Sequence, residues 1–371
     1  MRPRRICIVG MGSDTYGVLA GDEKVAFVGG EAVQQTLLAA AWRDLGVEVS
    51  IVLTDSPNPR DHMVSGMRVL PAYKSSLGFP VLRFLHPRMT GLFAALRRAD
   101  ADVYYQSPAG AATGFTARHC LWHNRQFLFR IASDANCIPG QQLIRLWRDR
   151  KLFEYGMRRA DLIAAQTEQQ RSLLRRHYHL DSELINMVAE PAEAAEPAAQ
   201  DIDVLWVGSY RPVKRPEALV DIARQLPKLR FALVGGSHGD AAGYFSRVSA
   251  AARQLPNIAV LGAVPYQQVG GLFDRAKVLV NTSTMEGFPN TFLQAWMRGI
   301  PVATTFDPDG IISREHLGRA AAQPAELVPT LAEMVANEAG RRAAAARIRA
   351  FALREYSAPA IARRYLDLLG K

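Results

Sequence analysis

The stretch TMEGFPNTFLQAWMRGIP, residues 284–301, decides how the rest of the chain is interpreted. It begins just after the run 277–281, Lys-Val-Leu-Val-Asn, which is short and valine-rich and is typical of a buried strand. Gly287 allows close approach of the backbone to a ligand, and Pro289 with Asn290 forms a stop and cap from which residues 291–298 are expected to be helical. A strand, a glycine turn and a helix N-terminus predict a phosphate site, because unpaired N–H groups and the helix dipole attract an anion.

Two polar side chains accompany this predicted helix N-terminus. Glu286 stands at its mouth, and Gln294 follows eight residues later, about one turn into the helix. A helical side chain leans toward the N-terminus of its helix, so Gln294 is expected to point to the same opening. In the alternative interpretation Glu286 caps the helix and Gln294 is solvated.

The whole string resembles the signature of retaining glycosyltransferases of the GT-B fold, family 4, in which two glutamates are separated by seven residues. The resemblance implies that Glu286 contacts the hydroxyls of a donor sugar and that the backbone after it holds the diphosphate. Gln294 replaces the second glutamate, which binds the nucleotide ribose, and an amide still accepts from and donates to hydroxyls. The implied diphosphate residues in this segment are Gly287, Phe288, Pro289 and Asn290.

A second motif carries the same resemblance. In this family a glycine that ends a strand is followed six residues later by a lysine that pairs with the donor diphosphate, and Gly208 and Lys214 have this spacing. Two phosphates carry about two negative charges that must be neutralised as the sugar leaves. Many members have arginine directly after the glycine, where this chain has Ser209, so the second cation is expected to be Arg211 or Arg215.

The N-terminal half begins with a strand, a glycine turn, a helix and a second strand. The strands are expected at residues 6–10 and 47–53, the helix at residues 32–45, and a long loop at residues 11–28. This order predicts a βαβ unit and therefore a parallel sheet with a right-handed crossover. A dinucleotide-binding fingerprint is excluded, because the third glycine comes too late and the helix begins about a dozen residues further on.

Two features of this half are candidates for ligand contacts. Gly29 and Gly30 resemble the glycine pair that begins the first helix of the family, near the donor phosphates and the acceptor, although a plain turn also explains them. Asp134 follows an expected strand at residues 127–132, and the carboxyl ends of parallel strands bind ligands in α/β sheets. We therefore expect Asp134 to touch acceptor or donor, with helix capping as the alternative.

Length and composition predict two domains. A chain of 371 residues is too long for one ordinary core, and residues 189–201, AEPAEAAEPAAQD, have the composition of a linker. We expect an N-terminal Rossmann-like acceptor domain at residues 1–188 and a C-terminal donor domain at residues 202–371, facing each other across a cleft. The last helix is expected to cross back to the first domain. The βα-rich halves predict the α/β class, and the resemblance implies the GT-B fold.

The sequence also leads to expectations about cellular location and cofactors. No run of eighteen apolar residues occurs, and the N-terminus enters a strand too early for a secretory signal, which favours the cytoplasm. The three cysteines, Cys7, Cys120 and Cys137, show no metal-ligand spacing and are expected to be reduced structural thiols. We expect no metal and no cofactor, and a nucleotide sugar as co-substrate.

The formal net charge is +10, and one basic segment indicates which kind of partner this charge attracts. Residues 63–99 contain no acid, and their cations alternate with leucine and phenylalanine. This mixture favours contact with an anionic inner-membrane surface, and an amphipathic core helix with a solvated basic face is the alternative. No motif for nucleic-acid binding occurs. The cations are Arg68, Lys74, Arg83, Arg88, Arg97 and Arg98.

Together with these features, the resemblance implies a retaining, metal-independent glycosyltransferase. The resemblance implies a UDP- or GDP-linked donor, with Glu286, Lys214 and Asp134 as the catalytic candidates. The expected acceptor is a hydroxyl of a saccharide or lipid-linked molecule, in cell-surface or exopolysaccharide synthesis. Two alternatives remain: a catalytically silent scaffold of the same fold, suggested by Gln294 and Ser209, and a nucleotide-sugar epimerase.

Overall fold

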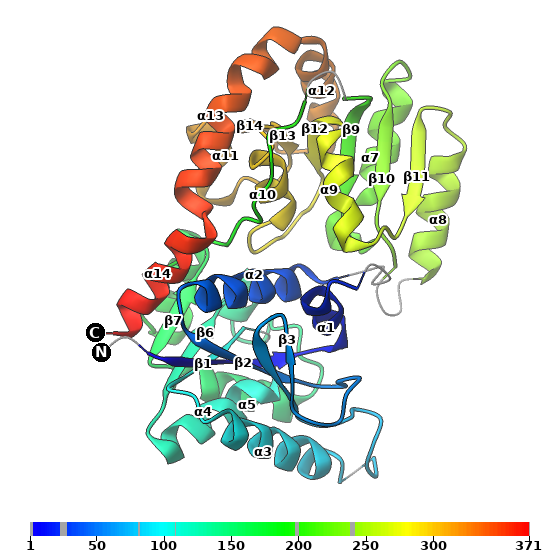
Figure 1. Ribbon diagram of the computed structural model, residues 1–371. Helices are drawn as coiled ribbons and strands as arrows, with labels where there is room; N and C mark the ends of the chain where they lie inside the picture. Colours follow the sequence, from blue (N-terminus) through cyan, green and yellow to red (C-terminus); the bar gives the residue numbers. More distant parts are fainter. Residues whose placement is uncertain are drawn as a thin grey trace. The chain divides into compact units, whose positions relative to one another are not determined.

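The computed structural model describes residues 3–22, 28–80, 82–107, 109–196, 200–237 and 242–370. These residues form two compact units, and each is described here by itself. Unit 1 contains residues 3–22, 28–188 and 358–370, and unit 2 contains residues 189–196, 200–237 and 242–357. Each unit is built on a parallel sheet that is covered by helices (Figure 1).

The sheet of unit 1 has the strand order β3-β4-β2-β1-β5-β6-β7-β8. All neighbours in it pair in parallel except β3 and β4, which form an antiparallel edge. The central strands of this sheet are buried and rich in β-branched and aromatic residues, so the sheet lies between two layers of helices. The strands are β1 Arg5–Met11, β2 Glu48–Leu53, β3 His62–Val64, β4 Met67–Pro71, β5 Val103–Gln106, β6 Gln126–Arg130, β7 Leu162–Ala165 and β8 Glu183–Leu184.

Seven α-helices pack around this sheet in the described part of unit 1. The predicted loop over residues 11–28 is wrong, because its first part forms α1, which ends where Gly21 adopts a left-handed φ of 67°. Residues 23–27 of that predicted loop lie outside the described residues. The helices are α1 Ser13–Ala20, α2 Gly30–Asp44, α3 Thr90–Ala99, α4 Ala111–His123, α5 Trp147–Met157, α6 Glu168–Tyr178 and α14 Ala358–Leu369, with short turns η1 Phe84–Met89 and η2 Asp134–Cys137.

The C-terminal helix α14 is part of the core of unit 1. Trp42 of α2 is fully buried, and its indole N–H donates to the carbonyl of Ala362 at 3.3 Å. Its ring makes edge contacts with Tyr105 of β5 and Tyr365 of α14. Buried aromatic rings of this size dominate core energetics, so these contacts hold the last helix on the first sheet.

The sheet of unit 2 is parallel throughout, with the order β11-β10-β9-β12-β13-β14. Its central strands β9 and β12 are almost entirely buried, as apolar strands covered on both faces must be. The strands are β9 Ile202–Val207, β10 Phe231–Val234, β11 Ile258–Gly262, β12 Ala276–Asn281, β13 Val302–Thr304 and β14 Gly318–Ala320.

The helices of unit 2 alternate with its strands. The helix predicted at residues 291–298 is present but begins one residue earlier, with Pro289 at the N-cap position and Asn290 as its first residue. It ends at Trp296, before Gly299 at a φ of 76°. The helices are α7 Pro216–Gln225, α8 Ala242–Arg253, α9 Tyr266–Asp274, α10 Asn290–Trp296, α11 Ile311–Arg314, α12 Leu327–Ala336 and α13 Glu338–Tyr356, with short turns η4 Pro212–Lys214, η5 Pro308–Gly310 and η6 Pro324–Glu326.

The described part of the linker-like segment, residues 189–196 and 200–201, is irregular and is attached to unit 2. The Ala189 N–H donates to the Tyr356 carbonyl at 2.8 Å, and the Ala195 N–H donates to the Arg298 carbonyl at 3.1 Å. Arg349 of α13 donates to the carbonyl of Ala192 at 2.6 Å. These backbone bonds replace the side-chain packing that its alanines and prolines do not provide.

None of the helices in the described ranges combines the length and the apolar character that crossing a bilayer requires.

Candidate active site

The candidate site of unit 2 lies where the strand order of its sheet reverses. β9, the first strand of the unit, pairs with β10 on one side and with β12 on the other, and β11 lies beyond β10. In open α/β sheets, ligands bind outside the carboxyl ends of the strands at such a reversal of strand order. Both sequence motifs lie here, since Gly208 follows β9 and Glu286 follows β12.

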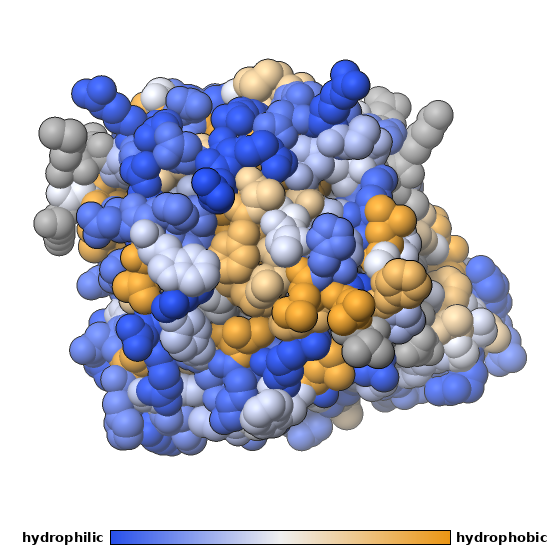
Figure 2. Space-filling model, turned by 90° about the horizontal axis from the view of Figure 1, so that it is seen from below, coloured by the Kyte–Doolittle hydropathy of each residue, from blue (hydrophilic) through white to orange (hydrophobic). Residues whose placement is uncertain are grey.

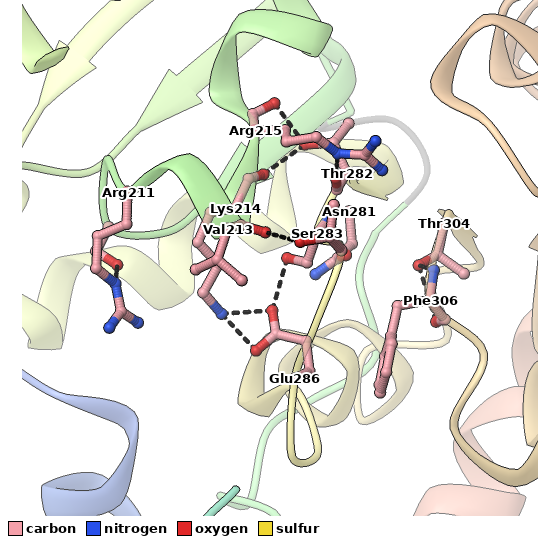
Figure 3. Close-up of polar contacts among 12 residues, drawn as sticks. Arg211, Val213, Lys214, Arg215, Asn281, Thr282, Ser283, Glu286, Thr304 and Phe306 are labelled. Carbon is pink, nitrogen blue, oxygen red and sulfur yellow. Dashed lines mark hydrogen bonds and ion pairs between the residues drawn. The ribbon is translucent and has the colours of Figure 1, made fainter. Parts of the chain in front are cut away.

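Hydrogen bonds join these two loops to each other (Figure 3). The Thr282 hydroxyl lies 2.8 Å from the carbonyl of Lys214 and 2.9 Å from that of Arg215, and it accepts from the Trp206 indole N–H at 3.0 Å. The Thr284 N–H donates to the Val213 carbonyl at 2.9 Å. Residues 208–215, which we call the lysine loop, are thus fixed on the loop that carries Glu286, although the two loops are distant in sequence.

The two central charges of the site are paired. The Lys214 ammonium donates to both carboxylate oxygens of Glu286, and the Ser283 hydroxyl donates to Glu286 Oε1 at 2.7 Å (Figure 3). The side chain of Lys214 is 20% exposed and that of Glu286 is 10% exposed. A carboxylate held by an ammonium and a hydroxyl is oriented before any ligand arrives.

The two arginines that the sequence left undecided have different surroundings. Arg215 donates to the Thr282 carbonyl at 2.7 Å and to the Thr305 hydroxyl at 3.1 Å, and its backbone is left-handed with a φ of 47°. Arg211 is exposed, and its Nε donates to the Ser209 hydroxyl at 3.0 Å. In Figure 3 the Arg211 guanidinium and the Lys214 ammonium point the same way, whereas Arg215 points toward Thr282. Arg215 is thus bonded to neighbouring segments and Arg211 to Ser209, and which of the two contacts a diphosphate remains a prediction.

A glycine contact fixes the start of the lysine loop. Gly235, at the end of β10, has a φ of 144°, and a Cβ atom there would lie 1.7 Å from the carbonyl oxygen of Gly208. The Gly208 N–H in turn donates to the Val234 carbonyl at 3.0 Å. Only glycine allows this approach of two loops, which explains why Gly235 follows that strand.

The segment after Glu286 is held by aromatic packing. The Phe288 ring contacts Phe292 and Trp296 of α10 and Tyr356 of α13, with centroid separations of 5.5 to 6.5 Å. Phe288 therefore anchors this segment through its side chain. Pro289 has no N–H to offer a phosphate, so any amide donors here belong to Gly287, Phe288 and Asn290.

Gln294 lies one turn into α10, as predicted, and its side chain is half-buried. Its carbonyl accepts from Arg298 at 3.2 Å. The expected contact with a ribose remains a prediction.

The remaining site candidates lie in unit 1. Gly29 is the N-cap residue of α2 and Gly30 is its first residue, which places the pair at a helix start as predicted. Asp134 is buried in η2, and its carboxylate accepts from the side-chain amides of Gln169 at 3.2 Å and Gln170 at 3.0 Å. Asp134 therefore links η2 to α6, and its expected contact with acceptor or donor remains a prediction.

Three residues near these sites were not predicted from the sequence. Thr282 and Ser283 orient the lysine loop and Glu286, and their signal is only two hydroxyl residues directly after a buried strand. Arg130, at the end of β6, is buried and forms an ion pair with Glu31 of α2 at 3.2 Å. Burial alone would lower the pKa of Arg130, but Tyr105 and Glu31 raise it on balance. The sequence feature that could have pointed to Arg130 is its place as a charged residue inside an apolar run.

Solved structures with the same architecture show the fold class. Sucrose-phosphate synthase from Thermosynechococcus elongatus has 17% sequence identity and a TM-score of 0.78, over 99% of this chain and 98% of that chain. Anabaena HepE, solved with UDP and glucose, has 15% identity and a TM-score of 0.77 over 99% and 100%. AviGT4, a glycosyltransferase of avilamycin A biosynthesis, has 16% identity and a TM-score of 0.64 over 98% and 96%. The predicted GT-B fold class is confirmed.

Family models agree with this class. Residues 29–190 match the model "Glycosyl transferase 4-like domain", and residues 201–337 match "Glycosyl transferases group 1". Together the two matches cover most of the chain, which belongs to the group 1 glycosyltransferases. No curated protein matches the sequence itself.

Proposed function

We propose that this protein transfers a sugar from a nucleotide-diphosphate donor to an acceptor hydroxyl, with retention of the anomeric configuration and without a metal ion. The observation that carries the proposal is the contact of Lys214 with Glu286 at the strand-order reversal of unit 2. A glycosidic bond to a diphosphate joins a hydroxylated ring directly to two phosphates. The Lys214 ammonium suits the phosphate side of that bond, and the Glu286 carboxylate beside it suits the hydroxyl groups of the ring.

In this proposal each group has a defined role. Lys214 and Arg211 neutralise the diphosphate as it leaves, with N–H groups from the segment 287–290, and Glu286 holds the hydroxyls of the sugar. Since Lys214 leaves Glu286 for the phosphates, the carboxylate is freed for the sugar in the same step. Gln294 binds the ribose, and Asp134 with Gly29 and Gly30 serves the acceptor side.

A UDP-linked donor is the first to test, because Anabaena HepE was solved with UDP and with UDP-glucose. The acceptor that we propose is a saccharide or a lipid-linked saccharide of cell-surface polysaccharide synthesis. The location that suits such an acceptor is the cytoplasmic face of the membrane.

A thermal-shift screen with UDP, GDP, ADP and their sugars tests the donor. A ligand at a hundred times its dissociation constant stabilises the folded protein by about 2.7 kcal/mol, so one nucleotide class is expected to raise the melting temperature clearly. Absence of a shift with every nucleotide would overturn the proposal.

The chemistry needs a separate measurement. Slow hydrolysis of the donor without acceptor is expected from an active enzyme, and NMR of the released or transferred sugar reports its anomeric configuration. Turnover is expected to survive EDTA. Nucleotide binding without any hydrolysis or transfer would favour a silent scaffold, and an inverted product would contradict the proposed stereochemistry.

A further inference from the structure

One face of unit 1 carries an unusual number of exposed large apolar side chains. Seven of them are between 52% and 86% exposed, and they come from two segments far apart in the sequence. We call these seven the apolar patch: Leu77, Phe79, Leu82 and Leu85 from the segment before α3, and Leu143, Leu146 and Trp147 at the start of α5.

A stacked arginine brings the two segments together. The guanidinium carbon of Arg148 lies 3.3 Å from the centroid of the Phe84 ring. Phe84 also contacts Phe115 of α4, with ring centroids 5.5 Å apart, and is packed against the core of the unit. The neighbours of Phe84 and Arg148 in sequence, Leu85 and Trp147, are therefore presented by adjoining parts of one surface.

Both segments of the patch carry cations, of which Arg68 and Arg98 are each paired with Asp61 at 3.2 Å. Residues 63–99 contain no acid, and the start of α5 contains one, Asp149, which is paired with Arg148 at 2.9 Å. Within the described part of the chain, no carboxylate lies at ion-pair distance from Lys74, Arg83 or Arg145. On the face that Figure 2 shows, apolar groups lie directly beside hydrophilic ones.

We infer that the apolar patch and the cations around it bind the surface of an anionic lipid bilayer. Exposed apolar surface of this extent marks an interaction site, and its basic surroundings select the partner, because anionic headgroups attract lysine and arginine while the acyl region receives leucine, phenylalanine and tryptophan. The inference uses unit 1 alone and does not depend on which donor binds unit 2. It extends the basic segment recognised in the sequence by the second segment, which only the fold brings near.

Vesicle sedimentation tests this inference with the full chain. Binding is expected to vesicles of phosphatidylcholine with phosphatidylglycerol, to fall as salt is raised, and to be weak with phosphatidylcholine alone. Each cation near such a surface strengthens binding by about fivefold, so the double variant Arg83→Ser with Arg145→Ser is expected to bind at least tenfold more weakly. The double variant Arg363→Ser with Arg364→Ser, which removes two exposed cations of α14, is the matched control and is expected to bind normally.

The apolar contribution has its own readout. Phe79→Ser with Leu82→Ser is expected to weaken binding about tenfold at low salt, whereas Leu353→Ser, at an exposed leucine of unit 2, is not. Brominated acyl chains should quench the emission of Trp147, and Trp147→Phe should lose that quenching. Melting temperatures and nucleotide shifts of all variants show whether the fold and the donor site are intact. Equal binding to neutral vesicles, unchanged binding of both patch variants, or no vesicle binding at all would overturn the inference.

Discussion

Lys214 and Glu286, which are 72 positions apart in the sequence, form an ion pair between the loops that follow β9 and β12. Both side chains are largely withdrawn from solvent, so removal of either one leaves the other charge poorly solvated. In the proposed function the pair also has a consequence for binding, because a donor phosphate is expected to compete with Glu286 for the same ammonium group. The Ser283 hydroxyl, which donates to Glu286 at 2.7 Å, is expected to hold the carboxylate in place during that exchange.

Lys214→Ala is expected to weaken binding of the nucleotide diphosphate by about 2 to 4 kcal/mol, because the phosphates lose a charged partner in a partly desolvated crevice. Calorimetric titration with UDP and GDP measures this. The matched control is Lys277→Ala, which removes a lysine paired with Asp203 in the same unit. Equal nucleotide affinity of the Lys214 variant and the unchanged protein would remove Lys214 from the site.

Glu286→Gln is expected to lower kcat by about 100-fold or more, with nucleotide affinity unchanged or higher. The positive charge that develops on the sugar ring is stabilised by a carboxylate but not by an amide, and Lys214 is freed from competition. Steady-state kinetics with the identified donor, together with calorimetry, separates the two effects. Were Glu286 only a residue near a helix terminus, turnover would stay normal and stability would change by at most about 1 kcal/mol.

The two arginines of the lysine loop predict opposite phenotypes. Arg211→Ala is expected to reduce nucleotide affinity about tenfold with an unchanged melting temperature, because its guanidinium is exposed and its hydrogen bond among the described residues is to the Ser209 hydroxyl of the same loop. Arg215→Ala is expected to lower stability by about 1 to 3 kcal/mol, because the Thr282 carbonyl and the Thr305 hydroxyl lose their donor. Denaturant unfolding and calorimetry on both variants distinguish them. Reversed phenotypes would make Arg215 the ligand residue.

Much of the fold was predictable because its signals are local. Periodic apolar runs identified β1, α2, β2, β9 and β12, and the two spaced motifs around Gly208 and Glu286 indicated the class. The short strands β13 and β14 were not predicted, since three residues carry too little periodicity to be recognised alone. The helix α1 was missed because its sequence SDTYGVLA lacks a continuous apolar stripe and contains Gly17.

The site shows a corresponding limit. Spacing indicated Lys214 and Glu286, but their direct contact depends on the pairing of β9 with β12, which sequence spacing does not encode. Spacing likewise did not distinguish Arg211, which donates to the Ser209 hydroxyl, from Arg215, which donates to Thr282 and Thr305. Thr282 and Ser283 have common residue types and act through short-range geometry, so no pattern in the sequence distinguished them.

The close approach of Gly235 to Gly208 leads to a test that links the fold to the site. Gly235→Ala is expected to destabilise the protein by at least about 3 kcal/mol, because the new Cβ would lie 1.7 Å from the Gly208 carbonyl oxygen and the φ of 144° is unfavourable for alanine. If the backbone instead moves to admit the methyl group, Gly208 shifts with the loop that carries Ser209 and Arg211, and nucleotide affinity falls. Gly271→Ala is the matched control, since this glycine of α9 has no atom within 4 Å of the added Cβ and alanine is expected to stabilise the helix by about 0.5 to 1 kcal/mol. Urea unfolding and calorimetric titration of both variants measure the two effects, and a Gly235 variant with unchanged stability and unchanged affinity would contradict the described contact.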